Sequence, residues 1–236
     1  MWGFFCYNLI CFLDYPLNLR FEKVNEHSLK LQILNPSQKL KASYQRLHID
    51  REKIELFKEN IKQSFQDITI ADKKKESEEH YKAIVRDFLL DTYYKGNHSI
   101  NTQGRNDLVI HNGSNATSPV GIIIETKQPT NKAEMISAKN PNSKSFQQLI
   151  TYFLKERFEN KNLEIKHLII SNIYEWYIFD ASDFERYFFE NKKLRDSYKD
   201  WNDGNIGFNK TDWFYKEIIN PHLEKNLESI ECTYFN

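Results

Sequence analysis

Apolar side chains recur at helical spacing in two segments of the first half of the chain. Residues 50–65 carry one such stripe, which predicts an amphipathic helix with Ile54, Phe57, Ile61 and Phe65 on one side. The polar stretch 67–75, which ends in three lysines, predicts a linker. A second helix is predicted from Ser77, which fits an N-cap followed by acidic residues, to about Gly96. Its stripe consists of Tyr81, Ile84, Val85, Phe88 and Leu89.

The next segments alternate in the manner of strands. Residues 107–111 (DLVIH) and 120–127 (VGIIIETK) have strand character, and between them lies the string of turn residues NGSNATSP. Turn residues between two short apolar runs are typical of a hairpin. The two segments are therefore predicted to pair as antiparallel neighbours.

The remainder of the chain alternates again between helix and strand. Residues 146–158 predict a third helix, and residues 168–171 and 176–179 predict two further strands. The tail from about residue 183, rich in aromatic and charged residues, predicts mostly helix, with Pro221 kinking or ending the last one. The tail aromatics are expected to pack these helices rather than to stack on bases. The order of elements predicts a mixed α/β sandwich.

Composition and charge narrow the class of protein. A hydrophobic content of 40% and an aromatic content of 14% suffice for a core and argue against wholesale disorder. Thirty-three basic residues cancel thirty-three acidic ones, so any contact with nucleic acid must come from a local basic patch. The three cysteines, Cys6, Cys11 and Cys232, lack metal-ligand spacing, which indicates reduced thiols in a cytoplasmic protein.

The chain opens on an atypical apolar run, MWGFFCYNLICFL, which stops at Asp14. It is shorter than the roughly 20 residues of a membrane-spanning helix, and it lacks the charged start and cleavage site of a signal peptide. It is either a packed element or sequence upstream of the natural start. Four regions are expected: an apolar extension over 1–30, a helical lead-in and linker over 31–76, a core over 77–183, and a helical, aromatic-rich tail over 184–236.

Three charged residues of the predicted hairpin form a candidate catalytic set. Glu125 and Lys127 point to one face of their strand, and such a pair at the end of an apolar strand is costly unless it opens onto a site. Asp107, on the preceding strand, comes to the same end when the hairpin closes. Two carboxylates can hold Mg²⁺, with Mn²⁺ as a substitute. Lys127 can orient the water that attacks a phosphodiester or stabilise the developing charge.

The order of these residues resembles the RecB-like branch of the PD-(D/E)XK nucleases, with Glu78 on a helix, Asp107 and then Glu125-Thr126-Lys127 on strands, and Gln148 and Tyr152 on a later helix. The resemblance implies that Glu78 completes the metal site formed by Asp107 and Glu125. It implies that Gln148 and Tyr152 contact DNA or support the catalytic lysine. Glu79 remains an alternative to Glu78, and Gln147 an alternative to Gln148. Asn106 stands where the motif has proline.

A closer resemblance covers residues 33 to 236 and includes GRNDLVIHNG, IIIETKQPTNKAEM and IKHLIISNIYEWYIFDASDFE. These segments are similar to the N-terminal nuclease region of type IIG enzymes, which join a nuclease to an adenine-specific DNA methyltransferase. The resemblance implies a restriction-endonuclease-like α/β fold, a mixed sheet flanked by helices with helical N- and C-terminal extensions. It also implies Mg²⁺-dependent cleavage of double-stranded DNA.

The same resemblance implies partners. Methyltransferase and target-recognition domains are expected in a longer form of the chain or in a separate subunit, since the ending ECTYFN is similar to the point where that family continues toward its methyltransferase. No Asn-Pro-Pro-aromatic motif for methylation and no P-loop is present in this sequence. The alternative is a non-catalytic DNA-binding or assembly module that retains the nuclease fold.

Other charged residues support weaker hypotheses. His111-Asn112 invites comparison with HNH nucleases, but no matching metal-site spacing follows it. Several basic residues could contact DNA phosphates if they lie beside the carboxylates, and otherwise form solvated faces: Lys73 to Lys75, Arg105, Lys132, Lys139 and Lys144.

Overall fold

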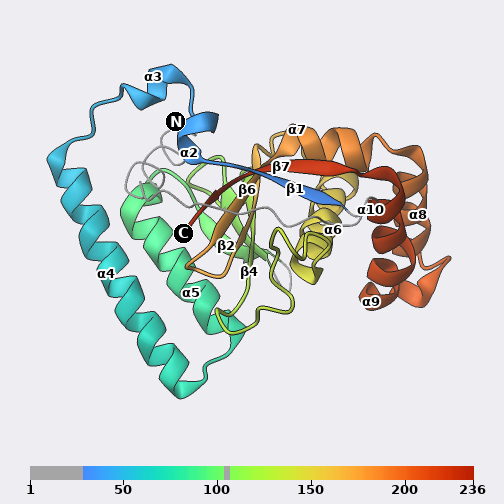
Figure 1. Cartoon of the computed structure of the whole chain (residues 1–236), viewed down its shortest axis with the longest axis horizontal. Helices are drawn as coiled ribbons and strands as arrows, with labels where there is room; N and C mark the ends of the chain where they lie inside the picture. The colour runs from blue at the N-terminus through green and yellow to red at the C-terminus, as the bar shows by residue number, and fades with distance from the viewer. Residues whose placement is uncertain (1–28, 104–106) are drawn as a thin grey trace.

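The computed structural model describes residues 29–103 and 107–236, except for the side chains of Gln103 and Asp107 (Figure 1). Of the apolar extension predicted over residues 1–30, residues 1–28 lie outside the described part, and so does Arg105. Among the helices of the described part, none is long and apolar enough to cross a membrane.

A seven-stranded mixed sheet forms the centre of the molecule. Its strands lie in the order β1-β7-β6-β5-β4-β3-β2. The strands are β1 (Lys30–Leu34), β2 (Ile100–Gln103), β3 (Asp107–His111), β4 (Val120–Thr126), β5 (His167–Ser171), β6 (Trp176–Asp180) and β7 (Ser229–Phe235). The β1–β7 and β4–β5 pairs are parallel and the other four pairs are antiparallel. The predicted mixed α/β class is therefore confirmed.

Helices cover both faces of this sheet (Figure 1). The long helix α4 (Arg51–Lys74) and α5 (Glu78–Leu89), which continues as a π-helical turn (Leu90–Tyr94), cover one face. The other face is covered by α6 (Lys144–Phe158) and by the helices of the tail. These tail helices are α7 (Ala181–Phe184), α8 (Lys192–Asn202), α9 (Thr211–Phe214) and α10 (Asn220–Asn226). Two short helices, α2 (Pro36–Lys39) and α3 (Ala42–Gln45), lie in the lead-in before α4.

Strand β4 separates two hydrophobic cores. Ile122 and Ile124 pack in the core beneath α4 and α5, whereas Ile123 packs in the core beneath α6. This is the alternation expected of a strand buried on both faces. All seven residues of β4 are buried, including the charged Glu125 near its C-terminal end.

The predicted hairpin and the two strands predicted after it are confirmed. β3 and β4 pair antiparallel, with Leu108 opposite Ile124 and Val109 opposite Ile123. β5 and β6 pair antiparallel across a tight turn at residues 172–175. The helices predicted from Ser77 and over 146–158 also form, as α5 and α6.

The linker predicted over residues 67–75 is wrong. Helix α4 continues to Lys74 because Ile68 and Ala71, both 0% exposed, extend its apolar stripe by two further turns beneath the charged surface. The helix ends at Lys75, whose φ of 55° is left-handed, as is common at a helix C-terminus. The three lysines thus belong to a helix end, where cations suit the dipole.

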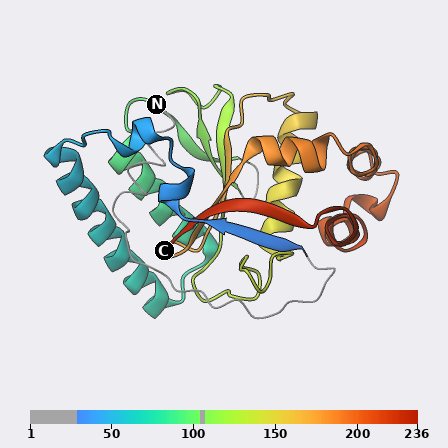
Figure 2. The same ribbon diagram turned by 45° about the horizontal axis from the view of Figure 1, so that its top comes forward.

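The expectation of a helical lead-in and a mostly helical tail is also incomplete, because each contains a strand. β1 comes from the lead-in and β7 from the tail, and the two lie side by side (Figure 2). β7 is inserted between β1 and β6 and buries Ile230 and Cys232. The tail before it is helical as predicted. Pro221 lies in the first turn of α10, directly after a π-helical turn, and the helix continues to Asn226, so Pro221 does not end it. Tail aromatics pack together, as in Trp201 and Phe214, whose ring centroids are 4.5 Å apart.

Substitutions in α4 test whether residues 67–74 are a packed helix rather than a linker. Ile68→Ala is expected to lower the free energy of unfolding by about 2–4 kcal/mol, because it leaves a cavity in the core. Ile70→Ala, two residues away but 50% exposed, should change it by no more than about 0.5 kcal/mol. Urea denaturation followed by circular dichroism measures both, and equal small effects would contradict the packed helix.

Candidate functional site

Glu125 and Lys127 lie at the C-terminal end of β4, in the middle of the sheet. The backbone N–H of Lys127 donates to the Ser171 carbonyl at 2.8 Å, so the residue after β4 stays fixed to the end of β5. Glu125 is 1% exposed and Lys127 is 2% exposed. Two oppositely charged side chains are therefore held almost out of water at the end of an apolar strand.

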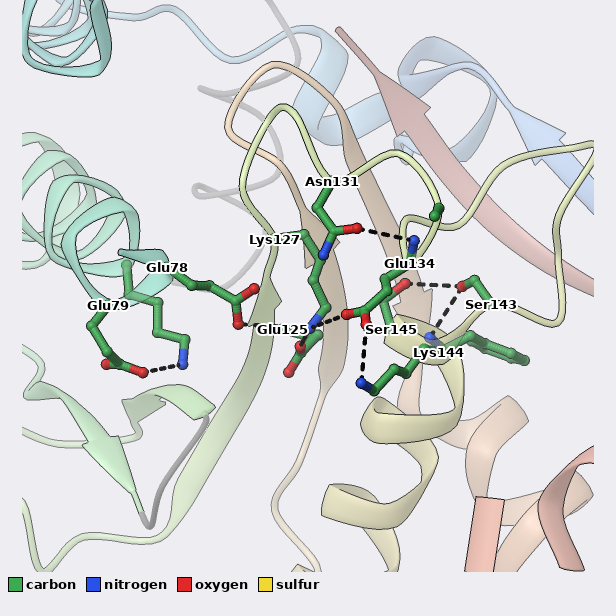
Figure 3. Close-up of polar contacts among 12 residues, drawn as sticks. Glu78, Glu79, Glu125, Lys127, Asn131, Glu134, Ser143, Lys144 and Ser145 are labelled. Atoms are coloured by element: carbon green, nitrogen blue, oxygen red, sulfur yellow. Dashed lines mark hydrogen bonds and ion pairs between the residues drawn. The ribbon is translucent and has the colours of Figure 1, made fainter. Parts of the chain in front are cut away.

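The Lys127 ammonium is surrounded by three carboxylates from three parts of the chain (Figure 3). Its Nζ lies 2.8 Å from Glu125 Oε1 on β4 and 3.6 Å from Glu78 Oε1 on α5. On the opposite side it lies 3.5 Å from Glu134 Oε2, in the loop before α6. The site thus lies between the N-terminal ends of α5 and α6.

Glu125 is the most perturbed acid of the site. Burial raises its pKa to about 7, although the charge of Lys127 opposes the shift. Its second oxygen, Oε2, has no hydrogen-bond partner among the described residues. Near neutral pH this carboxyl is poised between its two protonation states, and one of its oxygens is free to accept a ligand.

Lys127 keeps its proton. Burial alone would lower its pKa, but the adjacent carboxylates, Glu125 first and then Glu78 and Glu134, outweigh burial and raise it above its usual value. The side chain is therefore a fixed ammonium at neutral pH, and it can donate hydrogen bonds but cannot act as a base.

Only one of the two competing glutamates on α5 reaches this ammonium. Ser77 is the N-cap and Glu78 the first residue of the helix, so Glu78 is directed at the end of β4. Glu79 is directed away and pairs with Lys82 at 2.9 Å. The structure thus favours Glu78 over Glu79 as the helix carboxylate of the site.

Asp107 can be placed only by its backbone. It is the first residue of β3, and the register that sets Leu108 opposite Ile124 puts the next position, Asp107, across from Glu125. Its side chain lies outside the described residues. Within the described part, no group of three or more histidine, cysteine, aspartate or glutamate side chains is close enough together to hold a metal ion.

Gln148 and Tyr152 lie one turn apart on α6, as predicted. Gln148 is buried, and its Oε1 has no hydrogen-bond partner among the described residues. Gln147 instead donates to Asn142 Oδ1 at 2.8 Å, within the loop that leads into the helix. The buried glutamine is therefore Gln148, the preferred residue of the two.

The structure also adds charged residues that the motif analysis did not assign to the site. Glu134 pairs with both Lys127 and Lys144, and the Lys144 contact is 3.0 Å long. Lys82, 1% exposed on α5, contributes positive charge near Glu125. No local pattern signals these roles, because Glu134 lies in an irregular loop and Lys82 interrupts an apolar helix face.

His111, whose sequence context invites comparison with HNH nucleases, has both ring nitrogens in hydrogen bonds. Nδ1 lies 2.6 Å from the Ser118 carbonyl oxygen, and Nε2 lies 3.1 Å from Asn101 Oδ1. His111 is thus a buried structural residue. Lys132 and Lys139 are exposed in the loop before α6, which also carries Glu134.

Residues 34–236 match the model of a protein family described as a domain of unknown function (DUF7149). The chain belongs to this family. No curated protein and no solved structure gives a significant match. The DUF7149 match covers every element from α2 to β7, so the site between α5 and α6 lies within the family region, whereas only Leu34 of β1 does.

The pH dependence of stability tests the burial of Glu125. Its pKa is about 7 in the folded protein against an ordinary 4.5, so the folded state keeps a proton that the unfolded state releases. This contribution is fully present below about pH 4.5 and is lost as the pH rises through 7, on the order of 3 kcal/mol in all. In EDTA, the unfolding free energy of Glu125→Gln should fall less from about pH 5 to about pH 8 than that of wild type.

Glu79→Gln is the matched control for this comparison, because it removes a carboxylate that pairs with Lys82 and not with Lys127. It should keep the wild-type slope. Urea titrations at each pH give the slopes, and a Glu125→Gln slope equal to that of wild type would show that Glu125 titrates normally.

Proposed function

We propose that this chain is a Mg²⁺-dependent DNA endonuclease domain with a restriction-endonuclease-like fold, part of a type IIG-like restriction–modification system. The observation that carries the proposal is the end of β4. There, buried Glu125 has an oxygen without a partner beside the Lys127 ammonium, and Glu78 approaches the same ammonium from α5. The resemblance to PD-(D/E)XK nucleases assigns roles to these residues.

The residues present fit a divalent cation. A buried carboxyl with a pKa of about 7 and an unpartnered oxygen is poorly solvated by the protein, and a hard cation would offset that cost. Glu125 and Glu78 would hold the ion together with Asp107, whose register position faces Glu125. The backbone carbonyl of Thr126 is a further ligand in this assignment. A bound Mg²⁺ would lower the pKa of a water and polarise the phosphoryl group.

The chain's own residues supply the remaining chemistry. Lys127, a fixed ammonium, would donate a hydrogen bond to the attacking water or to a phosphoryl oxygen and stabilise the developing negative charge. Glu125 must release its proton before it can hold a cation, so activity is expected to rise as the pH passes through about 7. Gln148 and Tyr152 on α6 would support the DNA side.

Binding and specificity require more than this chain. The net charge of zero gives no general attraction to DNA, and the loop that carries Glu134 adds only two exposed lysines, Lys132 and Lys139. The proposal therefore includes target-recognition and methyltransferase domains, in a longer form of the protein or in a separate cytoplasmic subunit. Double-stranded DNA is the proposed substrate, cleaved slowly and with little sequence preference by this domain alone.

One observation favours a second candidate, a non-catalytic DNA-binding or assembly module. Three carboxylates, those of Glu125, Glu78 and Glu134, already surround the Lys127 ammonium. In that alternative the ion pairs only stabilise the fold. The two candidates differ in whether the cluster binds a cation and cleaves a phosphodiester bond.

Plasmid nicking with Mg²⁺ or Mn²⁺ distinguishes them. Wild type is expected to nick supercoiled DNA, whereas Lys127→Ala and Asp107→Ala should lose at least about 100-fold in rate, since each removes a group that acts on the transition state. Lys58→Ala, on the exposed side of α4, is the control and should retain the wild-type rate. The absence of metal-dependent nicking, or equal nicking by all four proteins, would leave the non-catalytic module as the better candidate.

Thermal stability measures metal binding without DNA. At a hundredfold excess of Mn²⁺ over its Kd, the melting temperature at about pH 8 should rise by roughly 5–10 °C, and the rise should shrink near pH 5, where protons compete for Glu125. Glu78→Gln should abolish most of the rise, and the neighbouring Glu79→Gln should keep it. Equal responses of the two variants would contradict the assignment of Glu78.

A further inference from the structure

Glu134 is a carboxylate that joins two lysines at the site. Its Oε2 lies 3.5 Å from Lys127 Nζ and its Oε1 lies 3.0 Å from Lys144 Nζ (Figure 3). It approaches Lys127 from the α6 side, opposite to Glu78. No motif considered in the sequence includes Glu134.

The backbone holds Glu134 in place although it lies in an irregular loop. Its N–H donates to Asn131 Oδ1 at 3.4 Å, and its carbonyl accepts from Ser145 N at 3.1 Å. Ser145 is in the first turn of α6, next to the N-cap Ser143, whose Oγ accepts from Phe146 N. Glu134 is therefore tied to the start of a buried helix, and its carboxylate is directed at Lys127 from a fixed point.

Glu134 carries a negative charge at neutral pH. Burial would raise the pKa of Glu134, but its hydrogen bond to Lys144 and the charge of Lys127 outweigh burial and lower it. The carboxylate between Lys127 and Lys144 is therefore an anion that both lysines stabilise.

We propose that Glu134 is a positioning residue that holds the Lys127 ammonium in place when Glu125 and Glu78 are engaged by a divalent cation. This inference rests on the proposed nuclease function. A bound cation draws the charge of Glu125 and Glu78 to itself and repels the ammonium. Glu134 lies on the other side and keeps an anion beside Lys127, and Lys144 keeps that anion oriented.

The titration of Lys127 itself tests the contact independently of nuclease activity. In the metal-free protein, the charged groups near Lys127 are Glu125, Glu78 and Glu134, with Lys144 behind Glu134 and Lys82 near Glu125. Heteronuclear NMR of the lysine side chains gives the titration midpoint of Lys127. Glu134→Gln should lower this midpoint, and Glu134→Asp, which retains the charge, should restore most of the difference. Glu55→Gln, which removes an exposed carboxylate paired with Lys58, should leave the midpoint unchanged.

Nicking rates of the same variants complete the test. Glu134→Gln is expected to reduce the Mg²⁺-dependent rate by about tenfold or more through misplacement of Lys127, and Glu134→Asp should recover part of the loss. An unchanged Lys127 midpoint in Glu134→Gln overturns the proposed role of Glu134. If the midpoint moves but the wild type nicks no DNA, the contact is supported while the nuclease function fails, so the two failures are distinguishable.

Discussion

The burial of one ion pair, Glu125 with Lys127, shapes the site more than any other interaction. Ions removed from water lose hydration free energy that a single partner rarely restores. Here the loss is divided among several groups: Lys127 has three carboxylates around it, and Glu125 has a pKa of about 7. Two of these groups come from other parts of the chain: Glu78 lies on α5, and Glu134 lies in the loop before α6.

The sheet makes this burial possible. β4 pairs with β3 on one side and with β5 on the other, and all seven of its residues are buried, so the pair at its end is enclosed by the strands beside it. The two faces of the strand pack against separate helical cores. β1 and β7, drawn from opposite ends of the chain, extend the sheet on the β6 side. Their pairing joins the lead-in and the tail into one body with the core.

How far the sequence predicts this arrangement depends on how local each feature is. The β3–β4 hairpin, α5, α6 and the shared end of Asp107, Glu125 and Lys127 follow from periodicity and turn residues, which act within a few residues of one another. The parallel pairing of β1 with β7 joins segments almost 200 residues apart, and the short, mixed sequences of those strands carry little periodic signal. The continuation of α4 to Lys74 depends on two buried apolar residues, Ile68 and Ala71. They lie within a charged stretch, so the sequence suggested a linker there.

The residues of the candidate site also differ in how far the sequence alone predicts them. Its strand carboxylates and lysine form a pattern in sequence, and the family resemblance supplied Glu78 and Gln148. Glu134 and Lys82 approach Lys127 and Glu125 only through the tertiary fold, so the sequence does not single them out. Lys144 is one of several basic residues that the sequence offers, and its pairing with Glu134 places it beside the site.

Under the proposed function, Glu125 and Glu134 have different protonation states and therefore different roles. A carboxyl with a pKa of about 7 can exchange its proton for a divalent cation near neutral pH, so the cost of burying Glu125 is offset when an ion takes the place of the proton. In the proposed mechanism this exchange would add positive charge beside Lys127, whose ammonium would have to remain in position. A carboxylate whose charge does not change, such as Glu134, would hold it there. Lys144 lowers the pKa of Glu134 and so maintains that charge, which links the surface pair Glu134–Lys144 to the chemistry proposed for the buried pair.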